Sequence, residues 1–208
     1  MPVQRLDDSL RARISANLAA HDRNAIADAS LTSAAVAIAL VTDDTGEASF
    51  VITRRSASLR KHSGQWALPG GRLDPGETEA VAALRELHEE IGLEREDDQV
   101  LGMLDDYPTR SGFAITPVVV WGGFNSVLRP NPAEVAEAHR VPIAALDAPG
   151  VPRIFDIPES DRPVISVPLL DDFIFAPTAA VLYQLREVAI HGRDTRVAHY
   201  DQPVFAWR

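Results

Sequence analysis

Three glutamates near the middle of the chain, Glu86, Glu89 and Glu90, have a spacing that would allow them to hold a metal ion. Residues at i, i+3 and i+4 share one face of a helix, so their carboxylates repel one another unless a cation lies between them. Such a dense set of oxygen ligands suits Mg²⁺ or Mn²⁺ better than zinc. Taken alone, the three glutamates are more typical of a solvated acidic helix face. The residues around them decide between the two interpretations.

Arg85, Gly71 and Glu77 extend this pattern. An arginine next to the glutamates can hydrogen-bond a neighbouring carboxylate and hold it in place. A glycine allows the backbone to approach the same carboxylates closely. Glu77 stands at the start of the predicted helix, near its positive end. The whole segment, rather than the glutamates alone, favours a carboxylate–metal cluster.

The segment follows the pattern G-x5-E-x7-R-E-U-x-E-E-x-G-U, where U is a bulky apolar residue, and it resembles the Nudix box at every fixed position. The matching residues are Gly71, Glu77, Arg85, Glu86, Leu87, Glu89, Glu90, Gly92 and Leu93. The resemblance implies an α/β fold of the α+β type, an α/β/α sandwich with a mixed β-sheet, in which the box forms a loop–helix–loop. It also implies hydrolysis, with Mg²⁺ or Mn²⁺, of a diphosphate joined to another group.

The resemblance further implies a role for each of these residues. Arg85 resembles the residue that orients the carboxylates, and Glu77 the acid that supports it. The implied metal ligands are Glu86, Glu89, Glu90 and the carbonyl of Gly71.

The attacking water needs a general base within hydrogen-bond reach, and Nudix proteins differ in which glutamate supplies it. Glu89 or Glu90 is our first candidate for this base. Glu134 or Glu137, which we place in a later loop, is the second.

A second pattern lies directly upstream of the box. The segment from Arg54 to Arg72 carries five cations and no acid, in a chain with a net charge of −10. A local excess of positive charge beside a metal cluster suits a substrate with a further phosphate. The alternative is an ordinary basic surface loop.

The spacing of this upstream segment resembles that of coenzyme A pyrophosphatases within the Nudix superfamily. The similar stretches are Val51-Ile52-Thr53-x-Arg55-Ser56-x3-Arg60-x3-Gly64-x3-Leu68-Pro69-Gly70-Gly71, Ile115–Val119, Asn131–Glu137 and Val141-Pro142. The sequence departs from that branch at Leu68, which replaces an aromatic residue, and at 174–179, where the change falls on an expected pocket wall. This resemblance implies Arg55, Arg60 and Gly70 as substrate-binding residues. The products would be 3′-phosphoadenosine 5′-phosphate and 4′-phosphopantetheine or its acyl form.

Two other functions stay open on the sequence. One is a Nudix hydrolase of ADP-ribose, dinucleoside polyphosphates or oxidised nucleotides. The other is a Nudix-fold binding module without turnover, in which we would expect some box glutamates to be lost. Trp66 has a similar ambiguity, because it could stack on an adenine or simply pack at a strand edge.

The elements that must position these residues are indicated by hydrophobic periodicity and by turn residues. We expect helices over 7–20, from about 78 to Gly92, and over 178–190, and strands over 34–42, 49–54, 65–68, 100–105, 114–121 and 164–169. We expect the Nudix domain to be the only domain of residues 1–208, with a helical extension over 1–32, a core over 33–190 and a tail over 191–208. The aromatic tail residues Tyr200, Phe205 and Trp207 predict that the tail packs on the core, or on a second copy in a homodimer.

Composition narrows the class of protein. The sequence has no cysteine, which removes disulfides, thiolate nucleophiles and cysteine-based metal sites, and agrees with a cytoplasmic location. The net charge of −10 argues against binding nucleic acid through its phosphates. No apolar run is long enough to span a bilayer, so we expect no membrane partner.

Overall fold

The central strand of the fold, β1 (Thr32–Thr42), is apolar on both of its faces. Ala35, Ala37 and Ala39 point into one hydrophobic cluster, whereas Ile38 and Leu40 point into the other. Alternate residues of a strand face opposite sides of the sheet, so this strand must be covered on both sides. The protein is described here from a computed structural model, which covers residues 4–57 and 64–204.

The main sheet is mixed, because β1 pairs parallel with β7 (Phe113–Gly123) and antiparallel with β2 (Ala48–Arg55). Its order is β3–β2–β1–β7–β5, with three short or lateral strands added. The remaining strands are β3 (Trp66–Ala67), β4 (Gly70–Arg72), β5 (Val100–Met103), β6 (Tyr107–Pro108) and β8 (Val135–Pro142). Strand β4 pairs with β1, which places the start of the glutamate-rich segment at the middle of the sheet.

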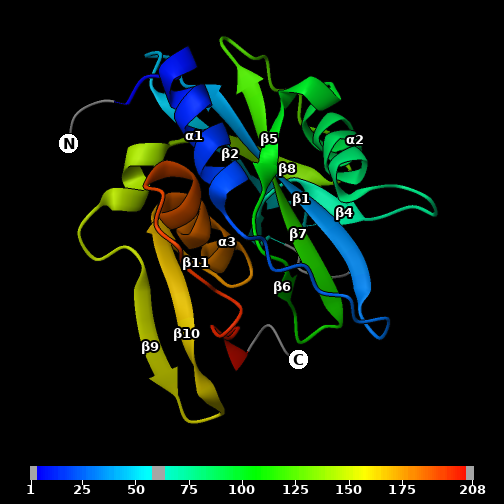
Figure 1. Cartoon of the computed structure of the whole chain (residues 1–208), viewed down its shortest axis with the longest axis vertical. Helices are drawn as coiled ribbons and strands as arrows, with labels where there is room; N and C mark the ends of the chain where they lie inside the picture. Colours follow the sequence, from blue (N-terminus) through cyan, green and yellow to red (C-terminus); the bar gives the residue numbers. More distant parts are fainter. Residues whose placement is uncertain (1–3, 58–63, 205–208) are drawn as a thin grey trace.

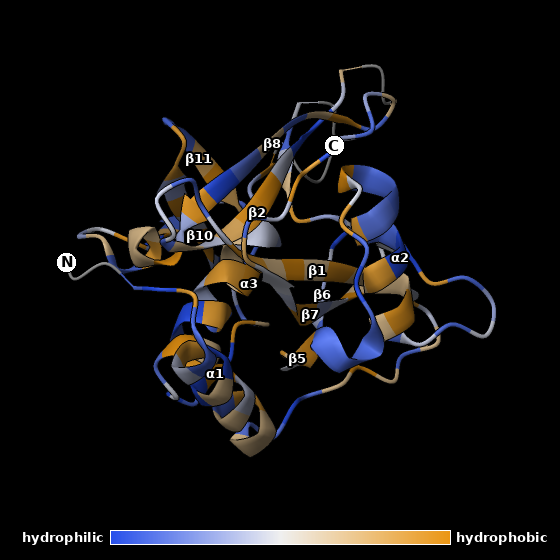
Figure 2. Ribbon diagram, turned by 90° about the horizontal axis from the view of Figure 1, so that it is seen from above, coloured by the Kyte–Doolittle hydropathy of each residue, from blue (hydrophilic) through white to orange (hydrophobic). Residues whose placement is uncertain are grey.

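Helices cover both faces of this sheet. Helix α2 (Glu79–Ile91) packs on the alanine face of β1, whereas α1 (Asp8–Ala20) and α3 (Thr178–Gln184) pack on the other. Figure 2 shows α2 on one side of the central strands and α1 with α3 on the opposite side. The α/β/α sandwich with a mixed sheet is therefore confirmed. None of the helices in the described residues is long and apolar enough to cross a bilayer.

A second, three-stranded antiparallel sheet lies beside α3 (Figure 1). It consists of β9 (Arg153–Ile157), β10 (Ser160–Leu169) and β11 (Asp172–Phe175). The inner side of β10 joins the same hydrophobic cluster as α1 and α3. Of these three strands, the sequence predicts only the part of β10 from 164 to 169.

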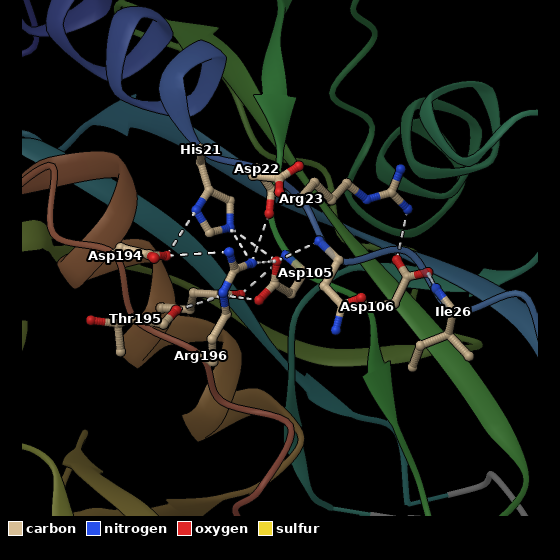
Figure 3. A network of polar contacts seen from close by, with 11 residues as sticks. His21, Asp22, Arg23, Ile26, Asp105, Asp106, Asp194, Thr195 and Arg196 are labelled. Atoms are coloured by element: carbon tan, nitrogen blue, oxygen red, sulfur yellow. Dashed lines mark hydrogen bonds and ion pairs between the residues drawn. The ribbon is translucent and has the colours of Figure 1, made fainter.

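A buried polar network fastens the end of α1 to the rest of the chain (Figure 3). One oxygen of Asp105 is 2.9 Å from Nε2 of His21, and it accepts hydrogen bonds from the backbone of Asn24 and from Arg196, both at 2.8 Å. The other oxygen accepts a 2.8 Å hydrogen bond from the amide of Gln184. Asp105 thus joins α1, the β5–β6 connection, α3 and the C-terminal segment.

The predicted elements are present, but strands β4, β6, β8, β9 and β11 were not predicted, and two further details differ. The last helix ends as a wider π-helical turn over Leu185–Ile190, so only its first half is α-helical. Glu137 lies within strand β8 and not in a loop, because residues 135–142 pair with β2. In the tail, Tyr200 is buried, as predicted, whereas Phe205 and Trp207 lie outside the described residues.

Candidate active site

Helix α2 has clear start and stop signals that fix which residues face the site. The side chain of Thr78 accepts a hydrogen bond from the backbone N–H of Val81 and caps the first turn. Gly92 ends the helix in the left-handed conformation, at φ 68°. Leu87 and Ile91 are fully buried against the sheet, which turns the glutamates toward the edge of the same interface.

The three glutamates of the helix lie in different environments. The Glu89 side chain is 55% exposed, that of Glu86 is 14% exposed and that of Glu90 only 3%. Burial raises the pKa of Glu90 to about 8, and the charges of Glu86 and Glu134 add to this effect. Burial also raises the pKa of Glu86 above its ordinary value. Two carboxylates are therefore held close together in a poorly solvated position.

Arg55 is the cation nearest to the most buried of these carboxylates. Its Nη1 lies 3.8 Å from Oε1 of Glu90, and its charge opposes the rise in the pKa of Glu90. The Nε of Arg55 is buried without a hydrogen-bond partner in the described residues. The two side chains form a loose ion pair, which compensates the buried carboxylate only in part.

Arg85 joins the acidic residues of the segment into one network. Its Nε and Nη2 donate to the two oxygens of Glu77, at 2.9 and 3.0 Å. Its Nη1 donates to Glu86 at 2.8 Å and to Glu89 at 3.2 Å, and Nη2 also reaches the carbonyl of Arg72. The hydrogen bonds from Arg85, and one from the backbone of Asp74, lower the pKa of Glu77 to about 2. Glu77 therefore stays ionised and holds the Arg85 guanidinium, which in turn hydrogen-bonds Glu86 and Glu89 on the helix.

Gly71 and Gly70 bring the backbone of β4 against the glutamates. A Cβ atom on Gly71 would lie 2.1 Å from Oε1 of Glu86, so any larger residue there would displace the Glu86 carboxylate. A Cβ atom on Gly70 would lie 2.4 Å from the carbonyl oxygen of Ala35 on β1. The backbone N–H of Gly70 also hydrogen-bonds the carboxylate of Glu90. Gly70 is therefore required by the neighbouring backbone of β1, and Gly71 keeps Glu86 in its present position.

The residues fit a hard divalent cation, although the cluster is not a closed cage. Within 4–57 and 64–204, no three aspartate, glutamate or histidine side chains already converge on one point. Glu86 and Glu89 instead share the Nη1 donor of Arg85. Glu90, which is buried, and Glu86, which is partly buried, have only partial compensation of their charge, and the backbone of Gly71 lies against Glu86. An all-oxygen set with excess negative charge is what Mg²⁺ or Mn²⁺ binds.

A cavity of about 600 Å³ opens beside this cluster. Its lining includes Arg55, Gly70 and Gly71, which contact the cluster. Strands β7 and β11 contribute a largely apolar part of the lining. The lining there includes Phe113, Ile115, Phe173, Ile174, Phe175 and Ala176. The volume and the mixture of apolar walls with a few charged groups are those of a small-molecule site.

The structure separates the remaining sequence candidates. The charge of Glu134 acts on both Glu86 and Glu90, which places it at the cluster. Glu137 instead contacts Arg54 at 3.3 Å and His139 at 2.9 Å, and these hydrogen bonds lower its pKa. Arg60 lies outside the described residues.

Some cavity residues were not singled out from the sequence. The departure at 174–179 does fall on the pocket wall, as the family resemblance implies, because Ile174 to Thr178 line the cavity. The contributions of Asp172, Phe113 and Gln202 carry no local signal, since each depends on pairing between distant segments. A strand prediction over 172–175 would have placed Asp172 near the wall.

Comparison with known proteins identifies the family of this chain. The sequence model of the NUDIX domain matches residues 32–164, more than half of the chain. The chain therefore belongs to the Nudix family, and it is a hydrolase that acts on diphosphate bonds.

Its relatives include the uncharacterized Nudix hydrolase NudL of Pectobacterium atrosepticum, 37% identical over 141 residues, which cover 65% of this chain and 72% of that protein. Nudix hydrolase 3 of Caenorhabditis elegans is 40% identical over 126 residues, which cover 58% of this chain and 52% of that protein. The chain thus matches about half the length of the nematode relative. Among solved structures, the M. smegmatis Nudix hydrolase RenU has a TM-score of 0.49 at 23% identity, over 79% of this chain and 89% of that one.

Proposed function

We propose that this protein uses Mg²⁺ or Mn²⁺ to hydrolyse the diphosphate bond of coenzyme A or an acyl-coenzyme A. The observation that carries the proposal is a pair of poorly solvated carboxylates, buried Glu90 and partly buried Glu86, beside the Gly71 backbone on the wall of a ligand-sized cavity. Buried carboxylates with raised pKa values are costly to keep ionised and mark a functional site more often than a structural one.

In this proposal each residue of the segment has a separate role. Glu86, Glu89, Glu90 and the carbonyl of Gly71 hold the cation, which supplies charge neutralisation on the diphosphate and activation of a water molecule. Arg85 holds Glu86 and Glu89 in position, and its two bonds to Glu77 fix the guanidinium plane. Arg55 and Gly70 line the cavity where the diphosphate would bind.

The general base remains a choice among glutamates at the cluster. Glu89 is the most exposed of the three box glutamates and can pass a proton to solvent, whereas Glu90 is the most buried. Glu134 is the alternative from outside the helix, because its charge acts on the same carboxylates. Glu137 is a weaker candidate, since its two oxygens are engaged by Arg54 and His139.

Two features favour coenzyme A over a smaller nucleotide. Five cations between 54 and 72 would match a substrate with a third phosphate, and Arg55 of this group lines the cavity. The apolar wall from Phe113 to Phe175 would suit a pantetheine or acyl arm. The departure at Leu68 does not touch the cavity, because Leu68 is buried in the hydrophobic core.

A substrate panel tests this proposal directly. The panel contains coenzyme A, acetyl-coenzyme A, ADP-ribose, a dinucleoside polyphosphate and an oxidised nucleoside triphosphate, each with Mg²⁺ and with Mn²⁺. We expect the highest kcat/KM on coenzyme A or its thioester, with release of 3′-phosphoadenosine 5′-phosphate. Activity on ADP-ribose without activity on coenzyme A would reject the substrate and retain the Nudix reaction. No turnover of any diphosphate would favour a binding module.

The surroundings of the enzyme are part of the same proposal. We infer a small-molecule substrate, no nucleic-acid or membrane partner, and a cytoplasmic location, from the acidic charge and the cysteine-free sequence. A homodimer and a monomer both agree with the exposed apolar residues Ile154, Phe155 and Phe173 on the second sheet. Sedimentation equilibrium would decide between the two.

A further inference from the structure

The indole of Trp66 is held in place by a residue of the second sheet. Trp66 lies in β3 of the main sheet, whereas Asp172 begins β11 of the second sheet. The Nε1–H of Trp66 donates a 3.1 Å hydrogen bond to Oδ2 of Asp172, and both residues line the cavity. This bond connects the two sheets at the lining of the cavity.

Two further contacts fix the plane of the indole ring. The ring of His139 meets it edge-on, with centroids 5.3 Å apart and an interplanar angle of 74°. The guanidinium of Arg54, the β-sheet partner of Trp66, lies 5.7 Å from the indole centroid. Three contacts from three different strands restrict a half-buried side chain that faces a cavity.

Asp172 is itself positioned by an unusual turn. Leu170 and Asp171 form the two-residue connection between β10 and β11, and both have positive φ, 54° and 57°. Aspartate tolerates this conformation, but Leu170 is a bulky residue for which it is unfavourable. The remaining oxygen of Asp172 accepts a 2.7 Å hydrogen bond from the backbone of Phe173. Each oxygen of the Asp172 carboxylate therefore has one hydrogen-bond donor, which is the backbone N–H of Phe173 for Oδ1 and the indole N–H of Trp66 for Oδ2.

We propose that Trp66 is the stacking platform for the base of the nucleotide half of the substrate, and that Asp172 is the residue that positions it. This inference rests on the proposed function in so far as the substrate contains a nucleotide. A fixed indole face is a surface on which a planar base stacks, whatever its hydrogen-bonding edge. Trp66 also precedes Gly70 by four residues in one segment, so the stacking surface and the carboxylate cluster share a cavity wall.

The test measures binding of AMP and of ribose 5-phosphate, which differ only by the base, to the complete protein by calorimetry. For Trp66→Ala we expect AMP affinity to fall about 10-fold or more, which is the scale of one base–aromatic stack. We expect the affinity for ribose 5-phosphate to stay unchanged. Trp66→Phe retains an aromatic face and should keep most of the AMP affinity. Trp121→Phe, in the core away from the cavity, is the matched control.

Asp172→Ala tests the positioning role through a split between KM and kcat. We expect KM for the nucleotide substrate to rise several-fold with kcat unchanged, and no further effect of Asp172→Ala in the Trp66→Ala background. AMP binding that is unchanged in Trp66→Ala, or lost equally for ribose 5-phosphate, would overturn the proposal, as would a wild-type protein that binds no AMP. If coenzyme A is not hydrolysed but Trp66→Ala still weakens AMP binding, the substrate assignment fails and the stacking platform stands.

Discussion

The backbone of Gly71 lies directly against the carboxylate of Glu86, so that a Cβ atom at position 71 would be 2.1 Å from Oε1. Gly71→Ala must displace either the glutamate or strand β4. A displacement of about 1 Å at a reacting centre costs about 100-fold in rate. We expect kcat/KM on the best diphosphate substrate to fall by about that factor or more, with a smaller change in thermal stability.

Gly46→Asn is a suitable control for this substitution. Gly46 also has an unusual backbone, at φ 83°, but a Cβ atom there would meet nothing within 4 Å. Asparagine tolerates the left-handed conformation, and the turn is remote from the cavity lining. If Gly71→Ala were as active as Gly46→Asn and the wild type, Gly71 would not be part of the active site.

Arg85→Lys probes the network that holds the carboxylates. Lysine cannot reproduce the two parallel bonds from Nε and Nη2 to Glu77 while also reaching Glu86. Losing a group that orients metal ligands costs 10- to 100-fold in metal affinity or activity. We expect a loss of this size, measured as the Mg²⁺ concentration that gives half-maximal rate. Arg13→Lys, on the exposed face of α1, should leave that concentration unchanged.

The sequence predicts those parts of the site that are encoded locally. The helix that carries the glutamates has its cap at Thr78, its apolar stripe and its terminal Gly92 within one segment, so its limits can be read from neighbouring residues. The hairpin of β1 and β2 has the same property, with its turn inside 43–46. The proximity of Gly71 to Glu86 could be predicted only from the resemblance of their spacing to the Nudix box.

What the sequence does not predict depends on pairing between distant segments. Strand β8 pairs with β2 although some eighty residues separate them, so Glu137 was wrongly placed in a loop. The apolar cavity wall comes from β11, a short strand of four residues that begins directly after a turn without glycine. The exposed fraction of each of the three glutamates could not be predicted either. Their spacing shows that they share one helix face, but it does not show how far the sheet covers that face.

Glu90→Gln separates metal binding from folding. Burial raises the pKa of Glu90 to about 8, so between about pH 4.5 and 8 the folded protein keeps a proton that the unfolded chain releases. Without metal, this group therefore makes the free energy of unfolding decrease as pH rises through that range. We expect Glu90→Gln in a chelator to weaken this decrease and to be no less stable at pH 8.

The same substitution should abolish function. We expect Glu90→Gln to lower kcat by several orders of magnitude and to remove the rise in melting temperature that Mg²⁺ or Mn²⁺ gives the wild type. Glu94→Gln, on the exposed segment after the helix, is the matched control and should retain both. Turnover by Glu90→Gln at the wild-type rate would contradict its assignment as a metal ligand.

Asp105→Asn tests the network that fastens α1 to the C-terminal segment. Hydrogen bonds from the backbone of Asn24 and from the Gln184, Arg196 and His21 side chains outweigh the opposing effect of burial and lower the pKa of Asp105. A lowered pKa contributes stability that is present above the unfolded value, near 3.8, and is lost as pH falls through the folded value. We expect the substitution to cost about 2–3 kcal/mol at pH 7, measured by urea unfolding.

The pH profile distinguishes this role from a general loss of packing. Wild-type stability should fall more steeply than that of Asp105→Asn when the pH is lowered from 5 to 3. Asp161→Asn, a change on an exposed strand residue, should follow the wild type throughout. Parallel profiles for all three proteins would show that the ionised carboxylate of Asp105 contributes nothing to stability.

Glu134→Gln and Glu137→Gln form a matched pair that tests the base outside the helix. The charge of Glu134 acts on Glu86 and Glu90, whereas Glu137 is occupied by Arg54 and His139. A general base contributes 10²- to 10⁴-fold to rate, so Glu134→Gln should lose about 100-fold or more in kcat if Glu134 is the base, and Glu137→Gln should lose little. If both variants stay within a few-fold of wild type while Glu89→Gln loses the rate, the base lies on the helix. The ranking of Glu134 above Glu137 would be wrong if Glu137→Gln alone were impaired, because its ion pairs would then have to open during turnover.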